Sequence, residues 1–409
     1  MTPLAVSAWT ATTAVGRGNA ALLAALEQER SGLRPNDFSG QPLETFIGRV
    51  QGIESLAWPD AWARFDCRNN RLAWLGATAD GFAGAVAAAC QRHGAHRVAL
   101  VLGTSTASIG ASEEAYATLG ADGQFAPPLR HPELHTPHST GHFLAEAFGI
   151  DGPSVTVSTA CSSSAKVFAQ AERLLRLGLA DAAVVGGADT LCGSVLFGFS
   201  SLELVSRQPC RPFDPARDGI SLGEAAGFAL LERAGAAGTA VARAWLLGHG
   251  ESSDAHHMSS PHPDGLGARL ALEAALRRAG LAPGDVDYIN LHGTASQMND
   301  RVEAAVVASL FPAHVSASST KGWTGHTLGA AGIVEAVVCL LALESGFRPG
   351  TLNTQSLDPA CGPQLRLRGE RARTRIALTQ SFGFGGNNCV LAFGSEPRSS
   401  EPRSSEPRA

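Results

Sequence analysis

The residues best suited to chemistry in this sequence are one cysteine, Cys161, and two histidines, His292 and His326. Cys161 follows a run in which polar residues alternate with valine, Ser154 to Thr159, and it precedes an apolar run that ends at Gly178. The alternation predicts a strand, and the helical spacing of the apolar residues after Cys161 predicts a helix. We therefore expect the sulfur at a helix N-terminus, where unpaired backbone N–H groups and the helix dipole favour a thiolate and a nearby oxyanion.

Both histidines follow short buried strands and stand next to glycine. The strands are expected at 286–291 and 315–319, and a long apolar helix is expected at 328–343. A lone cysteine is more often a small buried hydrophobe than a nucleophile, and a lone histidine at such a place is usually structural. In open α/β sheets, however, ligands gather at the carboxyl ends of strands. A sulfur and two neutral imidazoles together suit acyl transfer onto sulfur and loss of CO2 from a malonyl thioester, because the imidazoles can donate hydrogen bonds to an enolate.

Length and composition are those of a globular enzyme. The chain has 409 residues, is 44% hydrophobic and 17% charged, and carries a formal net charge of −5. This charge makes a nucleic-acid partner unexpected. No signal peptide is visible, and no run of about 18 apolar residues predicts a membrane span. Eight scattered cysteines without a Cys-x-x-Cys pair indicate reduced thiols, so we expect a cytoplasmic protein.

Strands alternating with helices predict an α/β fold with buried sheets. Two halves of similar order, divided near residue 245, suggest an internal duplication. The last residues, 395–409, repeat a Ser-Glu-Pro-Arg unit with period five and predict a flexible, disordered tail. Further strands are expected at 97–103, 181–189, 223–233, 375–379 and 389–393, further helices at 20–28, 71–93, 268–279 and 299–310, and loops at 111–150 and 196–199.

Two other clusters offer weaker signals. Four histidines, at 131, 135, 138 and 142, have the spacing of one helical face, which would suggest a metal site. Pro132 and Pro137 interrupt this run and no cysteine or carboxylate pair completes a ligand set, so we expect no metal. Arginines interleaved with aromatic residues at 58–71 could meet an acidic partner, although a solvated loop is the commoner meaning of such a run.

Several segments together resemble the beta-ketoacyl-acyl-carrier-protein synthases of the elongating kind, in the thiolase-like superfamily. Any one of them alone would be a weak signal, whereas their combination and order are specific. They run from about residue 97 to 393. The matching stretches are Thr159-Ala-Cys161-Ser-Ser, 218–227, 252–258, His292-Gly-Thr, Thr320-Lys321 with 324–332, and 381–388.

The resemblance implies a five-layered α-β-α-β-α fold of two pseudo-duplicated halves. Residues 1–245 would hold the nucleophile and residues 246–394 both catalytic histidines. The implied activity is that of an acyltransferase, in which an acyl-cysteine enzyme condenses with malonyl carrier protein in fatty-acid or polyketide elongation. Acyl carrier protein would be a partner, as would a second subunit, either the same chain or a related ketosynthase or chain-length factor. No cofactor is implied, because phosphopantetheine arrives on the carrier protein.

The resemblance also implies roles for single residues around the sulfur. Cys161, His292 and His326 would form a catalytic triad. Lys321 would sit behind His326 and pair with Glu335, which tunes the charge of the site. A pair of acidic residues after His292, at 300 and 303, would orient the site rather than act as an acid–base couple.

The remaining implied roles concern the substrate. Backbone N–H groups of Cys161 and Phe384 would form an oxyanion hole. Phe384 would also be a gate, with Phe199 facing the acyl channel. The small Thr106, reaching in from the dimer partner, would leave the pocket open to medium or long acyl chains. The pantetheine arm would contact Thr294 and Ser296.

The sequence departs from the family pattern at several points. The motif that begins at His292 reads His-Gly-Thr-Ala-Ser, which differs from the usual family form. The form Lys-Gly-Trp-Thr-Gly-His at 321–326 looks like that of synthases serving aryl-polyene-type pigment pathways. Glu203 stands where an arginine normally helps to grip the carrier protein. The candidates left for the acidic carrier surface are Arg68, Arg71, Arg130 and Arg207.

Two alternatives remain open at this point. A catalytically silent chain-length-factor subunit of a heterodimer would resemble a synthase, but such subunits usually lack the nucleophile. A thiolase would need a second catalytic cysteine near the last glycine turn, where Cys389 is the nearest candidate.

Overall fold

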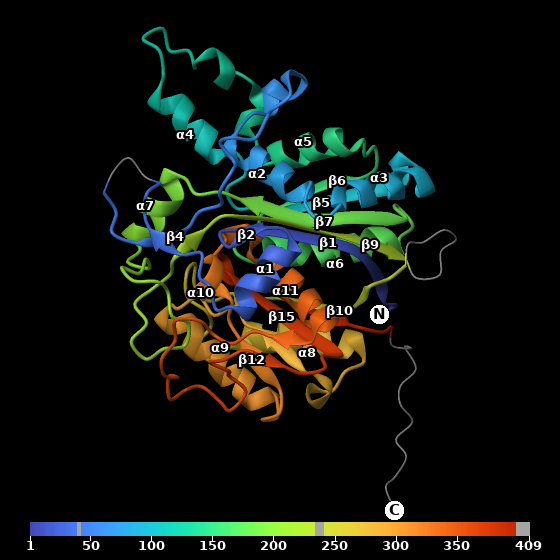
Figure 1. Ribbon diagram of the computed structural model, residues 1–409, viewed down its shortest axis with the longest axis vertical. Coiled ribbons are helices and arrows are strands. Elements are labelled where there is room, and N and C mark those ends of the chain that lie inside the picture. Colours follow the sequence, from blue (N-terminus) through green and yellow to red (C-terminus); the bar gives the residue numbers. More distant parts are fainter. Residues whose placement is uncertain (39–41, 234–240, 398–409) are drawn as a thin grey trace, which may run out of the picture.

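The computed structural model describes residues 1–38, 42–233 and 241–397, and its main feature is a large mixed sheet built in two similar halves (Figure 1). The strands of the first half are β1 (Leu4–Thr13), β5 (Val98–Gly103), β6 (Ser154–Val157), β7 (Ala182–Asp189) and β9 (Ala225–Arg233). Those of the second half are β10 (Ala244–Ser253), β11 (Tyr288–Asn290), β12 (Ser316–Ser318), β15 (Ile376–Gly383) and β16 (Asn387–Gly394).

The strand order confirms the predicted duplication. It is β6-β5-β7-β9-β1 in the first half and β12-β11-β15-β16-β10 in the second. Corresponding pairs also run in the same sense, with β5 parallel to β6 and β7 just as β11 is parallel to β12 and β15. The remaining pairs of each half are antiparallel. β1 pairs with β10 and joins the halves, and the boundary expected near residue 245 falls at the start of β10.

Helices lie in three layers around and between the two halves of the sheet, as the predicted five-layered fold requires (Figure 1). One outer layer packs on the first half and holds α2 (Arg68–Ala77), α3 (Phe82–His93) and α5 (Ser139–Phe148); the other packs on the second half and holds α8 (Leu266–Ala279) and α9 (Gln297–Leu310). The middle layer holds α6 (Ser163–Arg176) and α11 (Ala331–Ser345). Smaller helices are α1 (Asn19–Glu27), α4 (Ile109–Ala117), α7 (Gly193–Ser201) and α10 (Lys321–Thr324).

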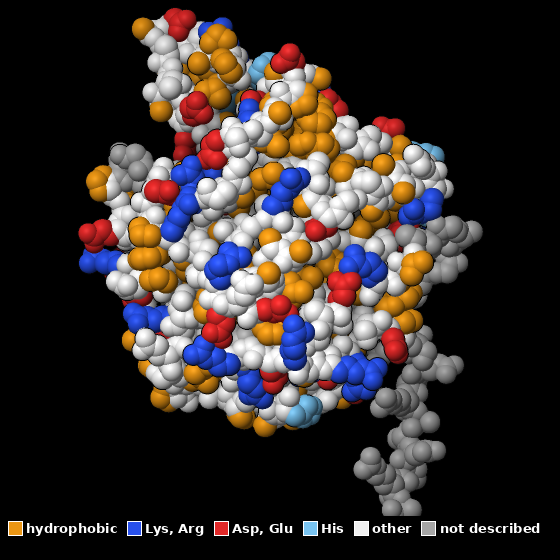
Figure 2. All heavy atoms as spheres, viewed as in Figure 1, with side chains coloured by type: hydrophobic (Ala, Val, Ile, Leu, Met, Phe, Trp, Pro, Cys, Tyr) orange, Lys and Arg blue, Asp and Glu red, His pale blue; other side chains and the backbone are white. Residues whose placement is uncertain are grey.

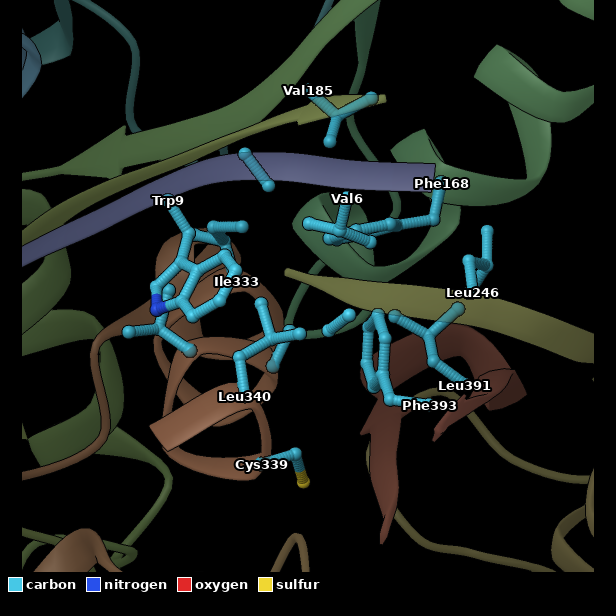
Figure 3. Packing of buried hydrophobic residues seen from close by; sticks show 14 of the residues in the cluster. Val6, Trp9, Phe168, Val185, Leu246, Ile333, Cys339, Leu340, Leu391 and Phe393 are labelled. Atoms are coloured by element: carbon cyan, nitrogen blue, oxygen red, sulfur yellow. The ribbon is translucent and has the colours of Figure 1, made fainter. Parts of the chain in front are cut away.

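The middle layer explains why the central strands and helices are so apolar. Every residue of β5 is buried, because α6 covers one face of the strand and the outer helices cover the other. Side chains from both halves interlock there, and Phe168 of α6 meets Phe393 of β16 with ring centroids 5.6 Å apart (Figure 3). Trp9 of β1 and Ile333 of α11 complete the same cluster. This core holds the two halves together.

Helix α11 is apolar enough to be mistaken for a membrane span. Residues Leu328–Ser345 have the length and hydropathy of a spanning segment, but 83% of this window is buried inside the fold. Its apolar character is therefore that of a helix packed between two sheets.

One predicted helix is broken in the structure. The helix expected at 71–93 is broken into α2 and α3, which meet at 77°. Asp80 and Gly81 have φ values of 53° and 71° there, and the Asp80 carboxylate accepts hydrogen bonds from Thr10 and from the backbone of Asn19. The break is thus fixed by a contact with the first strand and the start of α1, which local periodicity does not reveal.

The loops expected at 196–199 and 111–150 also contain helices. Phe199 lies in α7, whose first N–H groups, those of Gly193 and Ser194, donate to the carboxylate of Glu113 at 2.9 and 2.6 Å. A distant carboxylate therefore caps this helix, and no local cap marks it in the sequence. The loop-rich stretch contains α4 and α5. Of the tail expected at 395–409, residues 398–409 lie outside the described residues.

We predict that Gly332→Ala destabilises the protein, because α6 and α11 approach closely at this residue. A methyl group on Gly332 would come within 2.5 Å of the Ala165 backbone nitrogen. The free energy of unfolding should fall by about 1–3 kcal/mol, measured by urea denaturation. Gly84→Ala in α3 is the matched control, since a methyl group there meets nothing within 4 Å, and it should raise stability by about 0.5–1 kcal/mol. Equal stability of the two variants would contradict the close packing.

Candidate active site

Cys161 is held at the mouth of α6 by a tight turn after β6. Ala160 adopts a left-handed conformation, with φ of 51°, which costs a non-glycine residue energy. The hydroxyl of Ser163 stabilises this turn by accepting the Thr159 N–H at 2.9 Å and donating to the Ala160 carbonyl at 2.6 Å. Cys161 lies one residue before the N-cap Ser162 and is 5% exposed. The predicted position at a helix N-terminus is therefore confirmed.

His326 occupies the corresponding place in the second half, just before α11. Its backbone is clamped on both sides, because its N–H donates to Ser221 at 2.7 Å and its carbonyl accepts the Gly223 N–H at 3.0 Å. Its ring reaches across the middle layer to the sulfur, and Nε2 lies 3.0 Å from Cys161 Sγ. The other ring nitrogen, Nδ1, is buried and has no hydrogen-bond partner among the described residues.

His292 lies where β11 ends, and its loop is fixed by Glu303 of α9. The Glu303 carboxylate accepts the N–H groups of His292 and Gly293, each at 2.7 Å. The His292 and His326 rings stand at 88° with centroids 5.3 Å apart. Ligand atoms of Cys161 and both histidines all lie within 4.8 Å of one another, and all three residues are buried. Residues that are far apart in the sequence therefore share one space.

Lys321 is the exception to the expected arrangement. It was expected behind His326, but its Nζ lies 3.5 Å from Nδ1 of His292 and donates to the His292 carbonyl. It also forms the expected ion pair with Glu335. The reason is topological: β11 and β12 are adjacent and parallel, so the first residue of α10, which follows β12, faces the end of β11.

Burial sets the protonation states of the three groups. It lowers the pKa of both His292 and His326 well below the ordinary value, and the charge of Lys321 lowers both further. Both imidazoles are therefore neutral near pH 7. Burial also raises the pKa of the Cys161 thiol to about 11, although Lys321 and the Phe384 N–H act in the opposite direction. Burial thus opposes the thiolate expected at the helix N-terminus, and a base is needed to take the thiol proton.

The glycine turn after β15 brings Phe384 to the site. Its N–H lowers the pKa of the Cys161 thiol, and its ring stacks on Phe199 with centroids 5.7 Å apart at 26°. Gly385 and Gly386 have φ values near 77° and 76°, which favour glycine. The turn is tied to the segment after β10, because the Gly385 N–H donates to the Met258 carbonyl at 2.7 Å. In the sequence, only the family resemblance at 252–258 indicates that segment.

A cavity of about 370 Å³ opens onto these groups. Thr294 and Ser296 line it and share a hydrogen bond of 3.0 Å between their hydroxyls. Thr106 lies elsewhere, in a separate cavity of about 240 Å³ beyond β5, where it donates to Asp189. The walls of the cavity that opens onto Cys161 also include Leu202, Arg217, Asp254, Pro261, Met298 and Asn388.

Arg217 is a site residue that sequence reasoning missed. It is buried, it pairs with Asp358 at 2.8 Å, and its guanidinium donates to the carbonyls of Ser296 and Gln297 at 3.3 and 2.9 Å. It therefore fixes the backbone beside the cavity. One sequence signal could have indicated Arg217: it directly precedes the matched stretch at 218–227. The segment around it is rich in charged residues, and a buried strand follows it.

The four arginines proposed for the carrier surface fall into two classes. Arg68 forms a bidentate pair with the fully buried Glu224, and Arg71 forms one with Asp66. Arg130 and Arg207 are exposed. On the face drawn in Figure 2, Lys and Arg side chains are scattered among acidic ones and do not gather in one patch.

The other candidate sites do not assemble. Cys389 is fully buried in β16 and packs in the central core, so it does not serve as the second catalytic cysteine that a thiolase would need. His135 is bonded to Ser112 and to the Leu129 carbonyl. Within the described ranges, the Cys-His-His set is the one group of three or more potential metal ligands that converges.

Comparison with known proteins finds sequence similarity over most of the chain. Residues 91–237 match the family model for the N-terminal domain of beta-ketoacyl synthases, and residues 243–355 match that for their C-terminal domain. A mitochondrial 3-oxoacyl-[acyl-carrier-protein] synthase of Arabidopsis thaliana is 37% identical over 285 residues, which cover 66% of this chain and 62% of that enzyme. Nodulation protein E of Rhizobium meliloti is 35% identical over 312 residues, which cover 74% of this chain and 77% of that protein. The chain thus spans less than two thirds of the Arabidopsis enzyme.

Solved structures resemble the whole described fold. A ketosynthase from Xenorhabdus doucetiae, solved in complex with its chain length factor, superposes with a TM-score of 0.88 and 37% identity, covering 96% of this chain and 98% of that one. The ishigamide ketosynthase/chain length factor gives a TM-score of 0.85 at 27% identity, with 97% and 99% covered.

We predict that alkylation of Cys161 by iodoacetamide accelerates with pH up to about pH 10, because the raised pKa of its thiol leaves little thiolate at neutral pH. The rate, followed by intact mass, should rise about tenfold per pH unit between pH 7 and 9. Free glutathione, measured in parallel, should level off near its own ordinary thiol pKa. A rate that is flat across this range would indicate a resting thiolate–imidazolium pair instead.

Proposed function

This chain belongs to the beta-ketoacyl synthase family, and we propose that it is a condensing acyltransferase that extends acyl chains by decarboxylative Claisen condensation. Cys161 would accept an acyl group from a carrier protein, and malonyl carrier protein would then add two carbons, in fatty-acid or polyketide elongation. The observation that carries the proposal is the 3.0 Å contact between Cys161 Sγ and His326 Nε2, with His292 in the same space.

In the first half-reaction, neutral His326 acts as the base. Its Nε2 takes the thiol proton while the Cys161 sulfur attacks the acyl thioester, and the proton then passes to the departing carrier thiol. Negative charge on the carbonyl oxygen would be met by the backbone N–H groups of Cys161 and Phe384. The neutral state of His326 supports this step, because an imidazolium could not accept the proton.

In the second half-reaction both imidazoles act as donors. The bond between the malonyl Cα and its carboxylate breaks, CO2 leaves, and the electron pair forms an enolate whose oxygen accepts N–H bonds from His292 and His326. The enolate carbon then attacks the acyl-Cys161 carbonyl, and the C–S bond breaks to return the thiol after protonation. The product is a β-ketoacyl chain on the carrier protein.

The two histidines are suited to different parts of this cycle by their surroundings. The Lys321 ammonium can only donate, so its approach to Nδ1 of His292 favours a proton on Nε2 and makes His292 a fixed donor. Nδ1 of His326 has no partner among the residues described, so its tautomers can exchange. His326 can therefore accept a proton in loading and donate one in condensation.

The substrate roles are part of the same proposal. Phe384 and Phe199 would form a gate that separates loading from condensation, which their stacked rings support. Thr294 and Ser296, both on the cavity wall, would bind the pantetheine arm. Thr106 would limit the acyl pocket of a partner subunit. No cofactor beyond the arm that arrives with the substrate would be needed.

The partners would be acyl carrier protein and a second ketosynthase-like subunit. Similarity to a ketosynthase solved with its chain length factor supports a heterodimer of that kind, and a homodimer is the alternative. Exposed Arg130 and Arg207 are the better placed candidates for the acidic carrier, since Arg68 and Arg71 are engaged by carboxylates. An aryl-polyene-type pathway and a cytoplasmic location stay predictions. A silent chain-length-factor role is not favoured, because the sulfur and both imidazoles converge.

We predict that the three site residues separate the half-reactions. Cys161→Ala should abolish both acyl loading and condensation, measured by mass spectrometry of the enzyme and of the carrier-bound products. His326→Ala should slow both steps by about 10²- to 10⁴-fold. His292→Ala should spare loading and reduce condensation by about 10²- to 10³-fold, because His292 serves as a donor to the enolate.

Cys90→Ala, a partly buried cysteine of α3 on the outer layer, is the matched control and should leave both steps unchanged. Substantial elongation by Cys161→Ala would refute the role of the sulfur. Equal loss of loading in both histidine variants would refute the division of labour between them.

A further inference from the structure

The site's three side chains also form a set of metal ligands. Thiolate sulfur and imidazole nitrogen are the ligands that Zn²⁺ prefers, and catalytic zinc sites combine three protein ligands with one open position. Cys161, His292 and His326 supply three such atoms, mutually within 4.8 Å and buried. We propose that a soft divalent cation of the Zn²⁺ class binds this set and reversibly blocks the sulfur. The ion is an inhibitor in this proposal, not a cofactor.

The spacing of the ligand atoms suits such an ion. Zn–S and Zn–N bonds of about 2.3 and 2.0–2.1 Å in a tetrahedron place the ligand atoms roughly 3.3–3.6 Å apart. The sulfur and the His326 Nε2 lie 3.0 Å apart, so they need to separate by only a fraction of an ångström. The fourth position faces the cavity of about 370 Å³, which has room for a water molecule. The other ligand atoms lie within 4.8 Å of one another, so His292 must move toward the sulfur to complete the coordination.

Protonation favours the ion at His326. Its Nδ1 is buried without a hydrogen-bond partner among the described residues, so placing the proton there costs no existing bond and frees Nε2 as a ligand. Binding replaces the thiol proton: the S–H bond breaks, an S–metal bond forms, and one proton is released to solvent. The sulfur then has no free thiolate with which to attack an acyl thioester.

Lys321 opposes the ion at His292. Its ammonium repels a cation and holds Nδ1 of His292 as an acceptor at 3.5 Å, which keeps the proton on Nε2. The ion pair with Glu335 offsets the repulsion only in part. Lys321 thus has a second effect beside any part in condensation: it lowers the affinity of the Cys-His-His set for a soft metal ion.

The test uses the purified full chain without substrate, titrated with Zn²⁺ by calorimetry and with Co²⁺ as a spectroscopic probe. We expect one ion per chain and a thiolate-to-cobalt charge-transfer band in the near ultraviolet. Cys161→Ser should lose the band, and His326→Ala should weaken Zn²⁺ binding by about 10- to 100-fold. Cys90→Ser should behave as the unaltered chain, and Mg²⁺, which prefers oxygen ligands, should not bind. A charge-transfer band that persists in Cys161→Ser, or no binding at millimolar Zn²⁺, would overturn the proposal.

A double variant tests the part assigned to Lys321. Lys321→Met with Glu335→Gln removes the ammonium without leaving a buried carboxylate unpaired, and it should bind Zn²⁺ at least tenfold more tightly than the unaltered chain. Equal or weaker binding by a folded double variant would remove Lys321 from the proposal. In the unaltered chain, Zn²⁺ should also protect the sulfur: it should slow alkylation of Cys161 at least tenfold, and EDTA should restore the rate. Because no measurement involves condensation, the metal site and the proposed activity can fail separately.

Discussion

The close contact between helices α6 and α11 is the constraint on which the site depends. Each helix follows the edge strand of its own half, and the two meet where Gly332 leaves no room for a side chain beside Ala165. The Ser164 hydroxyl accepts the Ile333 N–H at 2.9 Å and locks the contact. Because Cys161 and His326 each lie just before one of these helices, the contact itself brings sulfur and imidazole within 3.0 Å. The reacting pair is a consequence of how the two halves pack.

Burial then decides what these groups can do. In water the thiol would ionise more readily and the imidazoles would spend part of their time charged. Inside the fold each charged form loses its hydration, so burial favours a thiol and two neutral rings. A buried cation, that of Lys321, is tolerated because Glu335 pairs with it. The site is therefore uncharged at its reacting atoms until an acyl thioester arrives, which suits alternating acceptance and donation of one proton.

Much of this arrangement could be predicted from sequence, and the failures share one physical cause. The strands that precede Cys161 and His292 were predictable, because period-2 alternation and short buried runs are local signals. The break between α2 and α3 was not, since Asp80 is held by Thr10, which is 70 residues away. Helix α7 was missed for the same reason, because its cap is Glu113. In each case a side chain from another element sets the backbone, and no window of sequence contains both partners.

The duplication also explains why only one of two equivalent strand ends carries a residue of the reacting site. β5 and β11 occupy the same position in their halves, and each end is held by a buried carboxylate. At β11, Glu303 binds the loop through backbone N–H groups and leaves the His292 ring free to face the sulfur. At β5, Asp189 accepts hydrogen bonds from the Thr104 hydroxyl and from the backbone N–H and hydroxyl of Thr106. The side chains of this loop are therefore already occupied by hydrogen bonds. One loop is anchored by its backbone and can present a ring, whereas the other is anchored by its side chains and presents no ring to the sulfur.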